Sequence, residues 1–331
     1  MNPAHQPANA QSGLGGCSCF GLVFLLVGGL VGSTVTPHQS RQEPQARIAV
    51  TTNLVVLPVN VTDSHGTFVG GLLQQNFRVY EDGQLQKVAL FAHEDTPVTV
   101  GLLVDHSGSM GPKLAEVAAA VSEFARSSNP HDEMFVVDFS DNVYIESFDG
   151  RNFTSDPKTL QRALLALSAR GQTALYDAVA QGLEQLELGS RDRRALVIVS
   201  DGGDNASRHK YYDVVTLARQ AHAVIYSIGL VGNSTEEENP RALERICRDT
   251  GGIAFLLHAG QNAGETAKVI ARDLREQYVL GYTPVRTVRQ NAFRKLSVKV
   301  DAPQVGKVRV RTRTGYVARF DNDSSSRNTR K

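Results

Sequence analysis

The sequence has few cysteines, and this scarcity limits how the fold is held together. Its 331 residues contain three cysteines, of which Cys17 and Cys19 lie near the N-terminus and leave Cys247 alone in the rest of the chain. A disulfide framework within the folded part is therefore excluded. Cys247 lies on the apolar face of the helix predicted from Arg241 to Thr250, and we expect a buried, inert thiol.

The sequence also has almost no net charge. A formal net charge of +1 provides no general attraction to phosphates, so nucleic acid is not expected as a partner. Apolar residues make up 41% and charged residues 21%, values close to those of soluble globular proteins, and most of the chain should fold. Its length allows two or three structural units.

The common catalytic motifs are missing as well. Ser107 lacks a G-x-S-x-G elbow, no P-loop or G-x-G-x-x-G cradle occurs, and the histidines are scattered without a metal-binding pair. We therefore expect a protein that is not an enzyme. A metal-assisted hydrolase stays open as an alternative, and it would need a general base beside a metal-bound water.

The N-terminal segment carries no acidic or basic side chain before Arg41, and Phe20 to Val35 is a nearly unbroken apolar run. This pattern predicts a signal peptide or membrane anchor over residues 1–40, although the usual basic start is missing. We expect the protein to be exported, whether periplasmic, secreted or membrane-anchored. Residues 17–35 then offer a possible membrane tether.

Two regions show the alternation of apolar and polar residues that is typical of β-strands. The first spans residues 46–94 and contains Asp82-Gly83, a hairpin turn signal. The second spans residues 277–320, and the tail at 321–331, rich in Ser, Asn and Arg, is expected to be disordered. We expect strands of the two flanks to pair into a small β-sandwich.

Residues 97–276 between these flanks follow another pattern. Val98 to Val104 is a continuous apolar run, as expected for a strand buried on both faces of a parallel sheet. Helical and strand patterns then alternate, which predicts a doubly wound, mostly parallel α/β sheet. The predicted helices are 113–126, 160–167, 174–186, 211–221, 241–250 and 263–275, and the further strands are 134–139, 195–199, 224–228 and 253–257.

Oxygen-bearing side chains follow the strands of this predicted sheet. Asp105, Ser107 and Ser109 come directly after the first buried strand, Thr173 precedes a helix, and Asp201 follows the strand at 195–199. The carboxyl ends of parallel strands meet at one edge of a sheet, where ligand sites form. Carboxylate and hydroxyl oxygens suit a hard divalent cation.

These three segments resemble the metal-ion-dependent adhesion site of von Willebrand factor A domains. Asp105, Ser107, Ser109, Thr173 and Asp201 match its five ligand positions without substitution. The resemblance implies Mg²⁺, or else Mn²⁺ or Ca²⁺, held by these side chains with one position left for a partner. It implies a protein-binding module whose partner presents an Asp or Glu carboxylate.

The flanks extend the resemblance beyond this domain. Phe77 to Phe91, with its Glu81-Asp82-Gly83 turn, and Tyr278 to Tyr282 are similar to the flanks of a bacterial von Willebrand A-related family of exported proteins. The similarity covers about residues 46–318. A different alternative is a cytoplasmic assembly factor that works with an ATPase, and it requires an N-terminal segment that is not exported.

Simpler structural roles remain for several of these residues. Asp105, Ser107 and Ser109 would in that case only cap the helix that begins near Pro112. His106 is expected to face solvent. Asp177 and Asp204 either orient metal ligands or waters, or else cap helices or lie solvated at the surface. The alternating basic residues near the C-terminus are expected to form a solvated strand face, and they are Lys307, Arg309, Arg311 and Arg313.

Overall fold

The structure is a computed structural model that describes residues 54–165, 167–232, 238–284 and 292–318. The expectations for residues 1–40 and 321–331 fall outside these ranges. Within the described ranges, no helix is both long and apolar enough to cross a lipid bilayer.

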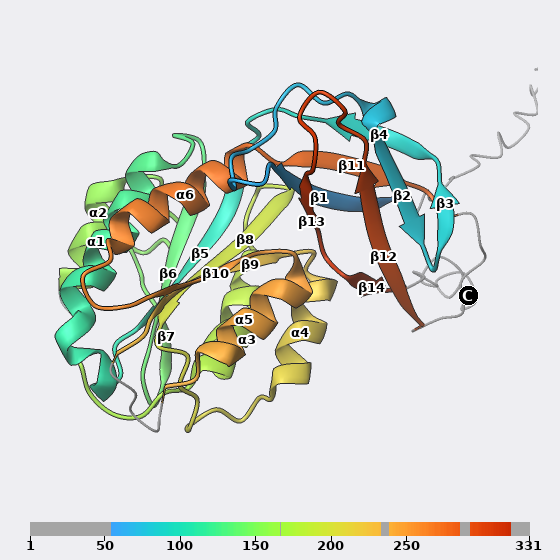
Figure 1. The fold of residues 1–331 in the computed structure, drawn as a ribbon. Helices are drawn as coiled ribbons and strands as arrows, with labels where there is room; N and C mark the ends of the chain where they lie inside the picture. The colour runs from blue at the N-terminus through green and yellow to red at the C-terminus, as the bar shows by residue number, and fades with distance from the viewer. Residues whose placement is uncertain (1–53, 166, 233–237, 285–291, 319–331) are drawn as a thin grey trace, which may run out of the picture. The chain divides into compact units, whose positions relative to one another are not determined.

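A six-stranded sheet forms the centre of the α/β region (Figure 1). Its strands, in the order β10-β9-β8-β5-β6-β7, are parallel except for the antiparallel pair of β6 and β7. All eight residues of β5 are buried, as its continuous apolar run predicts. The bounds are β5 Val98–Asp105, β6 Glu133–Phe139, β7 Val143–Ile145, β8 Arg193–Ser200, β9 Val224–Leu230 and β10 Ala254–Leu257.

Helices cover both faces of this sheet. One core joins β5 to α1, α2 and α6 through Val100, Leu102 and Val104, and the other joins it to α3, α4 and α5 through Leu103. Figure 1 shows the two helix layers on opposite sides of the sheet, so the predicted doubly wound fold is confirmed. The helices are α1 Leu114–Ser127, α2 Pro157–Leu165, α3 Leu175–Leu186, α4 Tyr211–Gln220, α5 Pro240–Thr250 and α6 Ala263–Arg275, with short 3₁₀ turns η1 Gln74–Asn76 and η2 Gly108–Lys113.

Strands from before and after the α/β region pair in two antiparallel sheets. Their orders are β13-β1-β11-β4 and β14-β12-β2-β3. The two sheets share one hydrophobic core, in which Leu57, Val79, Tyr278 and Leu296 are buried, so the expected pairing of the flanks is confirmed. The bounds are β1 Val55–Thr62, β2 Phe77–Glu81, β3 Gln84–Gln86, β4 Val88–Ala92, β11 Tyr278–Tyr282, β12 Phe293–Val300, β13 Arg309–Arg311 and β14 Gly315–Val317.

The turn at Asp82-Gly83 joins β2 to β3, as predicted. Both residues have positive φ, 49° for Asp82 and 81° for Gly83, which is the backbone of a two-residue hairpin turn. Glu81, just before the turn, is buried and accepts hydrogen bonds from the hydroxyls of Tyr282 at 2.6 Å and Tyr316 at 2.9 Å. These bonds tie strands β2, β11 and β14 together through one carboxylate.

The predicted solvated strand face near the C-terminus is wrong for two of its four basic residues, Arg311 and Arg313. Arg311 forms an ion pair with Asp273 of α6 and donates to the carbonyl of Gly251. Arg313 is 5% exposed and donates to the carbonyl of Val56 at 2.8 Å. Long arginine side chains reach partners that spacing along one strand does not reveal. Arg311 thereby fastens the β flank to the α/β region, whereas the contact of Arg313 with Val56 lies within the flank.

Candidate functional site

Asp105 ends β5 and lies beside β8 at the carboxyl edge of the central sheet. The parallel register pairs Val104 with Val199, and this brings Ser200 next to Asp105. The Ser200 hydroxyl donates to Asp105 Oδ2 at 2.6 Å, and the Ser107 amide donates to Oδ1 at 2.9 Å. Asp105 is fully buried, and this burial raises the pKa of its carboxyl to about 6 despite the two hydrogen bonds.

Ser107 and Ser109 follow in a tight turn. Their hydroxyl oxygens lie 3.3 Å apart, so the two side chains point to a shared space. The Ser107 side chain makes no capping hydrogen bond to the following 3₁₀ turn. This observation argues against a capping role for Ser107, and the two hydroxyls contact each other instead.

Thr173 is held between the other two loops by backbone contacts. The Gly108 amide donates to the Gly171 carbonyl at 3.0 Å, which joins the Thr173 loop to the serine loop. Thr173 itself receives a contact from the third loop, because its amide donates to Asn205 Oδ1 at 2.8 Å. Gly171 has a φ of +74°, which favours glycine, and a Cβ there would displace the Asp141 carboxyl, whose Oδ2 would lie 1.8 Å away.

Asp201 follows β8 and is only 1% exposed. Its Oδ1 accepts the Gly203 amide at 3.2 Å. Its Oδ2 is buried and has no hydrogen-bond partner within the part of the chain that the structure describes. The nearest cation is the Lys113 ammonium, 3.6 Å from Oδ2. A buried carboxylate oxygen without a donor is costly unless a cation completes it.

The donor set fits a hard cation. The three loops provide two buried carboxylates and three hydroxyls, which are the oxygen ligands that Mg²⁺ and Ca²⁺ prefer. The raised pKa of Asp105 and the unpartnered Oδ2 of Asp201 both indicate negative charge that the protein alone does not satisfy. Among the described residues, no group of three or more His, Cys, Asp or Glu side chains forms a metal cage.

His106 does not face solvent, and that expectation is wrong. The residue is 3% exposed, with Nδ1 3.2 Å from the Ser168 carbonyl and Nε2 3.3 Å from Asp138 Oδ2. The Asp138 carboxylate beside the ring raises the pKa of His106 above its usual value. Both ring nitrogens thus face groups of neighbouring segments, and the ring anchors the serine loop to β6.

Asp177 and Asp204 each accept hydrogen bonds from backbone amides. Asp204 accepts the Tyr176 amide at 3.2 Å, and Asp177 accepts the amides of Arg208 and His209 at 3.1 and 2.9 Å. Both contacts fasten the loop after β8 to the start of α3. Asp204 thus caps the start of α3, one of the roles that the sequence left open, and a role of either aspartate in orienting metal ligands stays a prediction.

Sequence reasoning missed Ser200, Asn205, Lys113 and Glu238. Ser200 directly precedes Asp201, so its place at the strand end was a usable signal. Lys113 and Glu238 are 125 positions apart, and only the fold brings the ammonium within 2.9 Å of the Glu238 carboxylate. No local pattern marks that pair.

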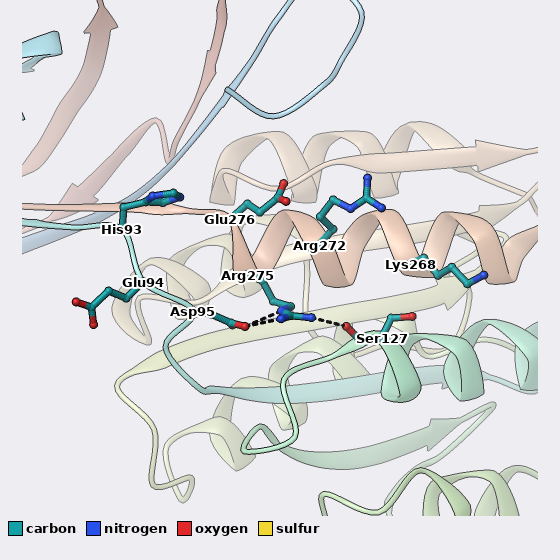
Figure 2. A pocket seen from close by; sticks show the side chains of 8 residues that line it. All are labelled: His93, Glu94, Asp95, Ser127, Lys268, Arg272, Arg275 and Glu276. Carbon is teal, nitrogen blue, oxygen red and sulfur yellow. Dashed lines mark hydrogen bonds and ion pairs between the residues drawn. The ribbon is translucent and has the colours of Figure 1, made fainter. Parts of the chain in front are cut away.

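A separate surface cavity of about 470 Å³ lies at the opposite edge of the sheet (Figure 2). Asp95, shortly before β5, pairs there with Arg275 at the end of α6 at 2.7 Å, and Arg275 also donates to the Ser127 carbonyl. Figure 2 shows both acidic and basic side chains lining the cavity. This cavity contains none of the five predicted ligand residues.

Several solved structures are similar to this chain. Similar solved structures include a von Willebrand factor type A protein from Catenulispora acidiphila, at 14% identity and a TM-score of 0.47, covering 82% of this chain and 76% of that one. An aerotolerance-related membrane protein from Bacteroides fragilis has 17% identity and a TM-score of 0.45, covering 54% of this chain and 98% of its own. The vWF domain of the pili tip protein Mfa5 from Porphyromonas gingivalis has 12% identity and a TM-score of 0.44, covering 54% and 95%.

No curated protein matches the sequence. The family profile of the von Willebrand factor type A domain matches residues 100–268, just over half of the chain. The matched range begins within β5 and ends within α6, so it contains the central sheet and all three loops. The chain therefore belongs to the von Willebrand factor type A domain family.

Proposed function

We propose that this protein is a non-catalytic binding module that holds one divalent cation, Mg²⁺ in the first place, at the carboxyl edge of its central sheet. The observation that carries the proposal is the buried Oδ2 of Asp201, which has no hydrogen-bond donor among the described residues. Asp105, Ser107, Ser109 and Thr173 are the other proposed ligands.

The charge of this ligand set suits the capture of an acid. Two aspartates at most balance the double charge of the ion, and hydroxyls add none, so the ion stays attractive to a further carboxylate. When bound, the cation supplies a positive centre for an Asp or Glu side chain of a protein partner. The residues of this chain hold that centre at the end of a rigid sheet.

The surroundings of the loops favour binding over catalysis. A hydrolase needs a general base within reach of a metal-bound water. His106 is the titratable ring adjacent to the site in sequence, and its nitrogens face the Ser168 carbonyl and Asp138. That ring is therefore occupied in holding the loop.

Calorimetry with MgCl₂ tests the proposal directly. The purified chain should take up one Mg²⁺, and Asp105→Ala should abolish the uptake because it removes a buried ligand. Ser109→Ala should weaken it less, since a neutral hydroxyl contributes less than a carboxylate. A chain that takes up neither Mg²⁺, Mn²⁺ nor Ca²⁺ would show the proposal to be wrong.

Partner binding is the second half of the test. Immobilised protein should retain a partner in Mg²⁺ and release it in EDTA, and the Asp105→Ala variant should retain none. Retention that persists in EDTA would contradict a metal-mediated contact. Fractionation of tagged protein would test the expected export, since a cytoplasmic location favours the ATPase-associated alternative.

A further inference from the structure

Lys113 lies between two buried acids at the border of the three loops. Its ammonium is 2.9 Å from Glu238 Oε1 and 3.6 Å from Asp201 Oδ2. The side chains of Lys113, Glu238 and Asp201 are 16%, 5% and 1% exposed, so little water separates these charges. One positive charge is thus shared by two acids, of which Asp201 is a proposed metal ligand.

The Glu238 carboxylate is also held by a backbone amide. Its two carboxylate oxygens accept the Gly232 amide at 3.0 and 3.1 Å. The next residue, Asn239, donates its amide to the Asp201 carbonyl at 3.3 Å. Glu238 is therefore held close to the Asp201 loop, and it keeps its place without depending on Lys113 alone.

The two distances show how the positive charge of Lys113 is shared between Glu238 and Asp201. A separation of 2.9 Å is a charge-assisted hydrogen bond, whereas 3.6 Å is an electrostatic contact without one. Glu238 thus takes the hydrogen bond, and Asp201 receives only part of the lysine charge. This division leaves Asp201 Oδ2 available to another cation.

We propose that Lys113 is a built-in counter-cation of the metal site and that Glu238 draws its charge away from Asp201. The pair then sets the affinity of the loops for a divalent ion. This inference rests on the proposed function. It adds two residues, outside the five ligands, that tune the same site.

A purely structural role makes a different prediction. If the ion pair only fastened the loops, removing either partner would loosen them, and both changes would weaken Mg²⁺ binding. If the pair tunes charge, the two changes act in opposite directions. Removing the lysine removes repulsion of the metal, and removing the glutamate frees the lysine to pair fully with Asp201.

Calorimetric Mg²⁺ titration of the full chain separates these cases. We expect Lys113→Met to bind Mg²⁺ about tenfold more tightly than the wild type, and Glu238→Gln to bind about tenfold more weakly. The double variant should bind at least as tightly as the wild type, because Glu238 acts through Lys113. Lys268→Met is the matched control, since Lys268 pairs with Glu265 and Glu123 on α6 and α1, and its affinity should not change.

Several outcomes would overturn the inference. Weaker binding by both single variants shows a loop fastener, and unchanged binding by both shows no role. If Lys113→Met does not fold, as judged by circular dichroism, the double variant takes its place, and binding weaker than that of the wild type refutes the idea. If the wild type takes up no divalent ion, the proposed function is overturned as well. If the wild type binds Mg²⁺ and both single variants change its affinity in the same direction, only this inference is overturned.

Discussion

Two buried aspartates lie at opposite edges of the central sheet, and their oxygens are satisfied to different extents. At the amino edge, Asp132 accepts the Val98 amide at 2.7 Å with one oxygen and the Asn129 amide at 3.1 Å with the other. At the carboxyl edge, Asp201 accepts the Gly203 amide with Oδ1, and Oδ2 has no donor among the described residues. The first aspartate is complete within the protein, and the second is not.

The pKa values of two other acids also differ between the two edges. Partial burial alone would raise the pKa of Glu133 at the start of β6, but hydrogen bonds from Thr99 and from Ser190 lower it below its usual value. Burial raises the pKa of Asp105 at the end of β5 to about 6. The donors around Glu133 favour its charged form, whereas the charged form of Asp105 stays unfavourable because of burial, although both of its oxygens accept hydrogen bonds.

The largest expected effect is that of Asp201→Asn on metal binding. The substitution keeps the shape and removes the charge, so Mg²⁺ affinity should fall about a thousandfold, or about 4 kcal/mol. Metal-free stability should not fall, because an uncompensated buried charge disappears. Calorimetry and urea unfolding measure both quantities. Retained Mg²⁺ affinity would remove Asp201 from the ligand set.

The second prediction concerns pH and Asp105. Its carboxyl ionises at about pH 6 when folded and near 3.8 when unfolded, so the metal-free fold loses stability as pH rises between these values. The loss should reach about 3 kcal/mol and stay constant above pH 6. Urea unfolding in EDTA from pH 3.5 to 7 measures it. The profile of Asp105→Asn should lack this slope, and identical slopes in both proteins would contradict the assignment.

The third prediction concerns Asp132 at the amino edge of the sheet. Asp132→Ala leaves the buried amides of Val98 and Asn129 without acceptors, and the free energy of unfolding should fall by about 2 kcal/mol. Mg²⁺ affinity should stay at the wild-type value, because this edge carries no proposed ligand. Weakened Mg²⁺ binding would show that the two edges are not independent.

The smallest expected effect is that of His222, which precedes β9 at the amino edge. Desolvation of its ring, followed by the positive charges of Arg313 and Arg194, lowers its pKa to about 4. Since the folded pKa lies below the unfolded value of 6.5, stability present above pH 6.5 is lost as pH falls toward 4. This residue still keeps part of its surface exposed to solvent, which screens its charge. We therefore expect the free energy of unfolding to fall by only about 1 kcal/mol.

His222→Asn is the matched variant for this measurement. His222 has a φ of +54°, a conformation that asparagine tolerates well. Thermal unfolding at pH 7 and pH 4.5 should show a smaller difference for the variant than for the wild type. An equal difference would assign the acid sensitivity to other groups.

The sequence predicted the parts of the fold that depend on local pattern. The buried β5, the alternating helices and the Asp82-Gly83 turn all follow from short-range periodicity, and so does the position of Asp105 at a strand end. The resemblance identified the five proposed ligands, and their joint binding of a metal stays a prediction. The expected burial of Cys247 is also confirmed, and this burial raises the pKa of its thiol to about 12.

What the sequence could not predict depends on partners far along the chain. His106 is buried because β6 brings Asp138 to its ring, and Arg311 is half-buried because α6 presents Asp273. The short antiparallel strand β7 was not expected either. In each case the long-range pairing has to be known before the fate of the side chain can be stated.

The pairing of β1 with β11 has a consequence for biosynthesis. Val59 lies opposite Tyr278, so about 220 residues separate the two partners in the order of translation. At roughly 5–20 residues per second, β1 waits more than about ten seconds on the ribosome before β11 emerges. During that interval the α/β region can mature while the earlier strands keep unpaired edges, and a chaperone that shields extended chain would find its target there.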